Sequence, residues 1–350
     1  MVGRIAIADR LVGVGAPCLI IAEAGVNHNG QPALAHALID AAAAAKADAV
    51  KFQTFRADRL AVTSAPKAAY QKRNGPAGES QLEMLRRLEL PDDVVRELAV
   101  HCRAKGILFL SSPFDEESAD FLDALGMPAF KVPSGELTNS PFLRHLAEKG
   151  KPLIVSTGMA DMSEVEAAVG VIRAADAPPF ALLHCVSNYP ADPADCNLHA
   201  IGALERAFGV PAGWSDHTTG IDIAVAAVAL GAAILEKHFT TDRALPGPDH
   251  RASLEPGELA DMVRAVRRVE SALGTGIKRP AASEANTASV ARKSLVAVRD
   301  LAAGTVISAT DLAARRPGTG LPPSRQGELL GRRLKINVAV GDLLTPEMLE

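Results

Sequence analysis

The feature of this sequence that most constrains its fold is a repeat. A short apolar run is followed by a helical pattern, eight times in succession. The first run, CLIIAEAG, carries Glu23 near its end and precedes an Ala-rich helix over 32–45. Strands that alternate with helices form a parallel sheet, and eight units in about 260 residues have the size of a (β/α)₈ barrel. A doubly wound open sheet would usually carry a GxGxxG turn, which IAEAGVNHNG lacks.

Two segments do not follow the repeat. Residues 56–89 form a polar insertion that is too long for a routine βα loop, so we predict a lid or a contact arm. After Leu273 the chain becomes polar, small and basic, which is typical of a linker. We therefore expect a barrel domain over 1–275, a linker over 276–292 and a small β-rich domain over 293–350. A domain of about 60 residues barely supports its own core, so it should lean on another surface.

Charge and composition exclude several partners. The net charge of −4 gives no general attraction to nucleic acid or anionic membranes. The four cysteines share no CxxC spacing, which favours reduced thiols over a zinc site or disulfides. The start MVGRIAIADR lacks a signal pattern, and no apolar stretch reaches the roughly 20 residues of a membrane span. We expect a soluble cytoplasmic protein.

Polar residues gather at the C-terminal ends of the predicted strands, where a barrel builds its active site. His217 and His238 follow two consecutive apolar runs, and Glu236 stands two residues before the second. Two imidazoles at neighbouring strand ends suit a metal ion, and the carboxylate suits an acid, a base or a third ligand. Alternatively, each histidine caps its strand and bonds a backbone carbonyl. The pair alone leaves both interpretations open.

Lys51 and Lys131 stand inside otherwise apolar runs, AVKFQ and AFKVP. Because burying an unpaired ammonium is costly, each lysine needs a partner. One interpretation is a buried ion pair with Glu23 or Glu136. Another is an anion site in which nearby serines help to hold a phosphate or carboxylate. A third is a Schiff-base lysine. The histidine pair favours carbon–carbon bond formation at a carbonyl that a divalent metal polarises.

Ten motifs, in order along nearly the whole chain, resemble the sialic acid synthases, which condense phosphoenolpyruvate with an N-acylated sugar. The motifs are AEAGVNHNG, VKFQTF, SSPFD, FKVPSGE, VSTGM, LLHCVSNYP, WSDHTTG, LEKHFT, GPDH and RPGTGLPP. The C-terminal segment resembles the family's antifreeze-like domain, of the SAF or β-clip type. The resemblance implies a (β/α)₈ barrel followed by this domain, and a phosphoenolpyruvate-dependent transferase.

The resemblance also implies a role for each site residue. His217 and His238 would bind a divalent ion, manganese first, with magnesium or cobalt as alternatives. Glu23 would be the acid/base, with Glu236 beside it. The residues that would hold phosphoenolpyruvate are Lys51, Lys131, Ser134, Ser156 and Ser215. The residues that would contact the sugar are Gln53, Tyr189, Asp249 and Arg316.

Family chemistry and assembly follow from the same resemblance. The enol carbon would attack the sugar aldehyde, water would add to the former enol carbon, and phosphate would leave with C–O cleavage. Arg316 would come from the partner subunit of a domain-swapped homodimer and reach the N-acyl group. Ser187 stands where N-acetylneuraminate synthases often carry Asn, so HCVSNYP is closer to members that make legionaminic-type 6-deoxy sugars. Either product type is compatible with the sequence.

Two other functions stay open. The first is a non-catalytic carbohydrate- or ice-binding protein that acts through the C-terminal domain. The polar strand ends, the arginine of RPGTG and the basic RRLK run argue against it. The second is a Schiff-base pyruvate aldolase on the same barrel, in which Lys131 would form a borohydride-trappable adduct.

Overall fold

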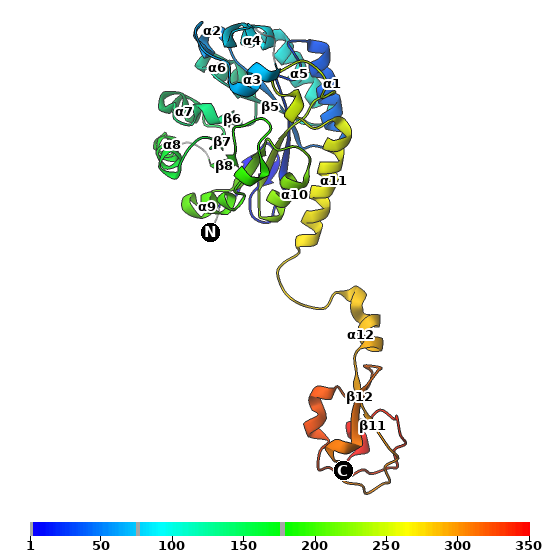
Figure 1. Cartoon of the computed structure of the whole chain (residues 1–350). Helices are drawn as coiled ribbons and strands as arrows, with labels where there is room; N and C mark the ends of the chain where they lie inside the picture. Colours follow the sequence, from blue (N-terminus) through cyan, green and yellow to red (C-terminus); the bar gives the residue numbers. More distant parts are fainter. Residues whose placement is uncertain (1–2, 75–77, 176–178) are drawn as a thin grey trace. The chain divides into compact units, whose positions relative to one another are not determined.

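The computed structural model describes residues 3–74, 78–175 and 179–350. By its contacts the chain divides into two units, Met1–Gly274 and Thr275–Glu350. We call them the barrel unit and the C-terminal unit, and describe each by itself (Figure 1).

Eight parallel strands form the centre of the barrel unit. Their bounds are β3 (Leu19–Gly25), β4 (Ala49–Thr54), β5 (Leu108–Pro113), β6 (Phe130–Val132), β7 (Leu153–Ser156), β8 (Phe180–Cys185), β9 (Ala212–Asp216) and β10 (Ile234–His238). The order in the sheet is β5-β4-β3-β10-β9-β8-β7-β6, with neighbours hydrogen-bonded. The two end strands, β5 and β6, lie side by side, so the sheet curls into a barrel. The predicted (β/α)₈ fold is confirmed.

The helices lie around the outside of the strands (Figure 1). They are α1 (Pro32–Ala44), α5 (Asp92–Lys105), α6 (Glu116–Ala124), α7 (Ser140–Ala147), α8 (Met162–Ala174), α9 (His199–Phe208), α10 (Asp222–Ala229) and α11 (Pro256–Leu273). Local signals explain several of the bounds. The side chains of Asp115 and Asp161 cap the first turns of α6 and α8. Gly106 and Gly209 end α5 and α9 in the left-handed conformation.

Alternation along the strands decides which side chains enter the barrel. In β3, Leu19 and Ile21 belong to the inner apolar cluster, and Ile20 belongs to the cluster between the strands and the helices. Since the period of a strand is two, Glu23 follows Leu19 and Ile21 into the interior. In β10, Ile234 lies in the inner cluster and Leu235 in the outer one, which sends Glu236 and His238 inward.

An N-terminal hairpin, which the sequence patterns do not predict, covers the amino ends of the strands. It consists of β1 (Ile5–Ile7) and β2 (Arg10–Val12), which pair antiparallel. Ile5, Ile7 and Val12 join the inner apolar cluster. Because apolar side chains fill this end of the barrel, the polar strand ends at the opposite end are left to form a site.

The insertion after β4 contains three short helices, α2 (Ala57–Leu60), α3 (Ala69–Asn74) and α4 (Gln81–Leu88). Arg86 pairs with Asp58 at 2.6 Å, and Glu79 pairs with Lys67 at 3.2 Å. Met84 and Leu88 of α4 form a small apolar cluster with Val26 and Phe55. The insertion also contributes side chains to the pocket described below, as a lid would.

The C-terminal unit has its own apolar core. It contains the helix α12 (Ala285–Ala291) and the antiparallel strands β11 (Ser294–Ala297) and β12 (Leu312–Arg315). Leu295, Leu301 and Leu334 are among the buried residues of this core. Residues 276–292, which the sequence assigns to a linker, include α12 and belong to this unit. Across the described ranges, no helix is long and apolar enough to cross a membrane.

Candidate active site

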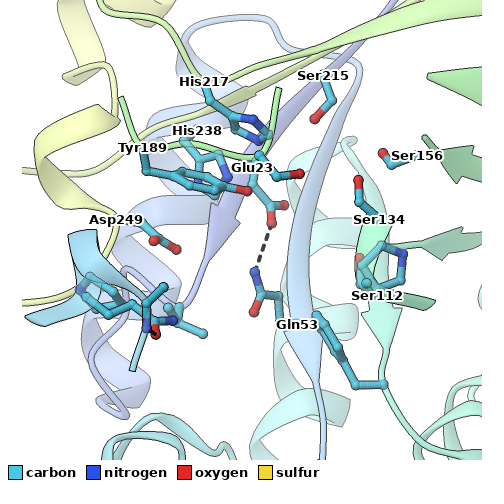
Figure 2. A pocket seen from close by; sticks show the side chains of 18 of the residues that line it. Glu23, Gln53, Ser112, Ser134, Ser156, Tyr189, Ser215, His217, His238 and Asp249 are labelled. Carbon is cyan, nitrogen blue, oxygen red and sulfur yellow. Dashed lines mark hydrogen bonds between the residues drawn. The ribbon is translucent and has the colours of Figure 1, made fainter. Parts of the chain in front are cut away.

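A pocket of about 470 Å³ lies at the carboxyl ends of the barrel strands. Nearly every residue that the sequence assigns to a site lines it: Glu23, Lys51, Gln53, Lys131, Ser134, Ser156, Tyr189, Ser215, His217, Glu236, His238 and Asp249. Figure 2 shows the histidines and Tyr189 at one side and Ser134, Ser156 and Ser215 at the other, with Glu23 between them. The exception is Arg316. It lies in the C-terminal unit, where its Nε donates a hydrogen bond to the Ala291 carbonyl at 3.1 Å.

The two buried lysines meet two buried carboxylates at the base of the pocket. Lys51 Nζ lies 2.8 Å from Glu23 Oε2, and both lysine nitrogens lie 3.8 Å from Glu236 Oε1. The ion pair expected between Lys51 and Glu23 is therefore present. The expectation of Glu136 as a second partner is wrong, because the strand alternation brings Glu236 to this place, and Glu136 accepts a hydrogen bond from Asn139 instead.

This pairing moves the pKa values of the two carboxyls apart. Burial raises the pKa of Glu23 to about 7, although Lys51 opposes the rise. Burial also raises the pKa of Glu236, but Lys131 and Lys51 together outweigh it, and the pKa falls below the ordinary glutamate value. Glu23 can therefore give or take a proton near neutral pH, whereas Glu236 stays ionised as a counter-ion.

Hydroxyl groups surround the lysines. Lys51 Nζ donates a hydrogen bond to Ser112 Oγ at 3.1 Å, and Lys131 Nζ donates to Ser156 Oγ at 2.7 Å. Ser215 Oγ donates to Glu236 Oε1 at 3.1 Å. Ser134 Oγ accepts a hydrogen bond from the Gly158 amide at 3.1 Å. Ammonium and hydroxyl donors in one buried place form a ready site for a phosphate or carboxylate.

His217 and His238 face each other across 5.4 Å between ring centroids. His217 Nδ1 lies 2.7 Å from the Val186 carbonyl, which only accepts, so Nδ1 carries the proton and Nε2 keeps its lone pair. His238 Nδ1 is buried and has no hydrogen-bond partner within the described ranges. Burial lowers the pKa of His217 to about 4 and that of His238 well below the ordinary value. Both rings are therefore neutral, as metal ligands must be.

These features fit a divalent metal ion. Two neutral imidazoles form a suitable donor set, in which the buried His238 Nδ1 is left unsatisfied among the described residues. The Val186 carbonyl orients the His217 ring as outer partners of metal ligands do. No group of three or more histidine, cysteine or carboxylate side chains in the described part of the chain is arranged to hold a metal. His217 and His238 would thus be the protein ligands, which leaves room for water or substrate.

Both tyrosines of the chain meet in this pocket. The Tyr189 ring lies 4.1 Å from that of His217 and 4.9 Å from that of Tyr70, which comes from α3 of the insertion. Tyr70 is a site residue that the sequence analysis did not find. The sequence signal that could have pointed to Tyr70 is that the chain contains two tyrosines in all. Nearby, burial raises the pKa of Asp249 to about 7.

The chain is similar to known proteins over nearly all of its length. The model of the NeuB family matches residues 38–278, and that of the SAF domain matches residues 292–350. An N,N'-diacetyllegionaminic acid synthase from Legionella pneumophila is 47% identical over 337 residues, which are 95% of this chain and 95% of that protein. The synthase of the same name from Campylobacter jejuni is 46% identical over 328 residues, 93% of this chain and 98% of that one.

A solved structure agrees with these sequence matches. The N-acetylneuraminic acid (sialic acid) synthetase from Leptospira borgpetersenii, crystallised with citrate, is 37% identical with a TM-score of 0.73. The match covers 82% of this chain and 95% of that one. The chain belongs to the NeuB family of sialic acid synthases and carries a SAF domain at its C-terminal end.

Proposed function

We propose that this protein condenses phosphoenolpyruvate with an N-acylated mannosamine-type sugar to form a nonulosonic acid and phosphate. The observation that carries this proposal is the meeting of a buried lysine pair and a neutral histidine pair in one pocket. Phosphoenolpyruvate brings two anionic groups, which need cationic donors. The open-chain sugar brings an aldehyde, which needs an electrophilic activator.

The lysine side of the pocket would hold phosphoenolpyruvate. Lys51 and Lys131 supply the positive charge, and hydroxyl groups supply further donors: Ser134, Ser156 and Ser215. Lys51 pairs with Glu23, and Lys131 lies near Glu236. The protonation of Glu23 near neutral pH would lower the negative charge that an incoming phosphate meets.

The histidine side would activate the sugar. His217 and His238 would hold a divalent ion, manganese according to the family resemblance. When bound, this ion would supply Lewis-acid polarisation of the aldehyde oxygen. Gln53, Tyr189 and Asp249 also line the pocket, with Tyr189 and Asp249 on the histidine side, and all three would orient the sugar chain.

The proposed condensation accounts for each bond that forms or breaks. The methylene carbon of phosphoenolpyruvate bonds to the aldehyde carbon, whose oxygen takes up a proton and becomes a hydroxyl. Water adds to the former enol carbon, and the bond from this carbon to the bridging oxygen breaks. Phosphate leaves with the bridging oxygen. Glu23 lies 2.8 Å from Lys51 at the base of the pocket and would move the proton of the water or of the leaving group.

We propose N,N'-diacetyllegionaminic acid, or a close relative, as the product. The two synthases of that name support this choice. The insertion supports it independently, because apolar side chains line its side of the pocket: Leu60, Met84, Leu85 and Leu88. Such a wall suits the methyl groups of a 6-deoxy sugar and of acetamido groups better than hydroxyl groups.

A substrate panel tests this proposal. Purified protein with Mn²⁺ and phosphoenolpyruvate is given 2,4-diacetamido-2,4,6-trideoxymannose, N-acetylmannosamine or N-acetylmannosamine 6-phosphate, and phosphate and the nonulosonic acid are measured. We expect both products to appear fastest with the diacetamido sugar. Faster reaction with N-acetylmannosamine would move the product to N-acetylneuraminate. Absence of phosphate release across the panel would contradict the proposed condensation.

One observation favours a second candidate, a Schiff-base pyruvate aldolase. Burial lowers the pKa of Lys131, and a buried lysine with a lowered pKa is a better nucleophile. Borohydride reduction in the presence of pyruvate separates the two candidates by mass spectrometry. A trapped adduct on Lys131 would support the aldolase, and an unmodified Lys131 is the result expected here.

A further inference from the structure

Another buried lysine, Lys237, lies outside the pocket and has no place in the proposed chemistry. Lys237 stands between Glu236 and His238 in β10, and its side chain is fully buried together with that of Asp216 in β9. Since Glu236 and His238 face the interior of the barrel, alternation directs Lys237 to the outer side of the strand. Neither Lys237 nor Asp216 lines the pocket.

These two residues form a network with Thr218. Lys237 Nζ lies 3.0 Å from Asp216 Oδ2 and donates a hydrogen bond to the Thr218 carbonyl at 2.5 Å. Asp216 Oδ1 accepts from the Thr218 amide at 2.8 Å and from Thr218 Oγ1 at 2.7 Å. We call Lys237, Asp216 and Thr218 the Lys237 network. It joins the residue before His238 to the residues on both sides of His217.

The register of the sheet shows why this connection matters. The last residue pair between β10 and β9 is Lys237 with Asp216. His217 therefore stands one residue beyond the ladder, whereas His238 still pairs with Glu23 of β3. Outside the ladder, and among the described residues, His217 itself is fixed by two hydrogen bonds: its Nδ1 donates to the Val186 carbonyl, and its carbonyl accepts from the Ala191 amide. The Lys237 network links this end of β9 directly to β10.

A gain in the free energy of folding does not by itself explain why such a network is present. A buried ion pair is often no more stabilising than well-packed apolar side chains of similar volume, because both charges lose their hydration. What an apolar pair does not provide is a directional link from an ammonium group to a chosen carbonyl. Here this link connects the backbone of one histidine strand to the loop of the other histidine.

We propose that Lys237, Asp216 and Thr218 are positioning residues that hold His217 and His238 at the separation needed to bind one divalent ion. This inference rests on the metal site of the proposed function. The network touches neither substrate nor ion, and it acts by restricting the backbone at His217 relative to β10. Loss of such outer contacts typically weakens metal binding roughly 10- to 100-fold.

The test compares two double variants that each remove both members of an ion pair, fully buried in the first variant and partly buried in the control. The first is Lys237→Met with Asp216→Asn. The control is Arg267→Met with Asp48→Asn, whose groups pair at 2.5 Å, with Asp48 also bonded to the Ile20 amide near the amino end of β3. Mn²⁺ affinity is measured by calorimetry on metal-free protein, and the melting temperature is measured on the same samples.

We expect the first double variant to bind Mn²⁺ roughly 10- to 100-fold more weakly, and the control to melt earlier but to keep the affinity of the wild type. Equal Mn²⁺ affinity in the first variant and the wild type would overturn the inference. An equal loss in both variants would overturn it too, because the effect would then be general destabilisation. A wild-type protein that binds no Mn²⁺ would refute the metal site itself.

Thr218 gives a milder variant in case the double substitution does not fold. Thr218→Val keeps both charges paired and removes only the hydroxyl that donates to Asp216. It should weaken Mn²⁺ binding by less than the double variant, and Thr218→Ser should restore it. Unchanged affinity in a folded Thr218→Val protein would exclude the hydroxyl from the positioning role and contradict the network as proposed.

Discussion

At the scale of single residues, the environment gives identical side chains different roles. Glu23 and Glu236 are both buried beside lysines, yet their pKa values move in opposite directions. The difference arises because Glu236 lies near both Lys51 and Lys131, whereas Glu23 pairs closely with Lys51 alone. Position in the barrel, rather than residue type, thus separates a carboxyl that can exchange a proton near neutral pH from one that stays ionised.

A substitution at Gly158 would test the lysine side of the pocket, which we propose holds phosphoenolpyruvate. A Cβ at this position would overlap Ser187 Oγ and lie 2.8 Å from Ser134 Oγ and from Cys185 Sγ. Because these atoms line the pocket, Gly158→Ala should displace the donors and lower kcat/KM for phosphoenolpyruvate on the order of 100-fold. Gly170→Ala in α8, where a Cβ would meet no atom within 4 Å, is the matched control. Similar kinetics in both variants would contradict this placement of Ser134.

Asp249 should make stability depend on pH. Burial raises its pKa from 3.8 to about 7, so the folded protein holds this proton more tightly than the unfolded chain does. The wild type should therefore lose stability as pH rises from about 4 to 7, by roughly 4 kcal/mol for this group, with no further loss above pH 7.

Asp249→Asn should lack this loss. Urea unfolding of both proteins between pH 5 and pH 8 should show that the advantage of the variant grows up to about pH 7 and then stays constant. A difference that is independent of pH would mean that burial does not raise the pKa of Asp249.

At the scale of elements, the strand–helix repeat made much of the site predictable. Polar residues at the ends of β3, β4, β6 and β7 to β10 line one pocket, as the positions of parallel strand ends require. The partner of Lys131 was not predictable. Glu136 is near in sequence, but the choice of Glu236 depends on the register between distant strands. The place of Tyr70 in the pocket was not predictable either. The insertion lacks the strand–helix pattern, so its sequence does not indicate where its helices lie.

The insertion should act mainly on the sugar. Tyr70 of α3 lies against Tyr189, which contacts His217 on the histidine side of the pocket. Since an aromatic pair contributes about 0.5–1.5 kcal/mol beyond burial, Tyr70→Ala should raise KM for the sugar up to roughly tenfold and leave KM for phosphoenolpyruvate nearly unchanged. Tyr70→Phe should resemble the wild type. Equal increases in both KM values would show that the insertion covers both substrates alike.

At the scale of the whole molecule, the chain combines two units that each have a core of their own. In the C-terminal unit, Ser294 holds the loop that follows Arg316 at two points: its Oγ donates to the Pro317 carbonyl at 2.7 Å and accepts from the Gly320 amide at 2.9 Å. The family resemblance places Arg316 over the sugar of a partner subunit. Sequence patterns within one chain do not reveal such a contact, so it stays a prediction.

Subunit mixing tests the predicted exchange. Glu23→Gln should inactivate the barrel of its own chain, and Arg316→Ala should impair sugar use wherever its C-terminal unit acts. If the units are exchanged, a mixed dimer contains one site with both intact residues, and activity should reappear after subunits of the two variants are mixed. The unmixed variants are the controls. If activity does not return after verified subunit exchange, Arg316 acts within its own chain.

We propose that one pocket joins phosphoenolpyruvate to an N-acylated sugar with cleavage of the C–O bond. Phosphoenolpyruvate labelled with ¹⁸O at the bridging position tests it directly, with Mn²⁺ and 2,4-diacetamido-2,4,6-trideoxymannose present. We predict that phosphate is released only when sugar, phosphoenolpyruvate and metal are all present, and that mass spectrometry finds the label in the phosphate. Label in the nonulosonic acid, or phosphate release that does not need the sugar, would contradict this account.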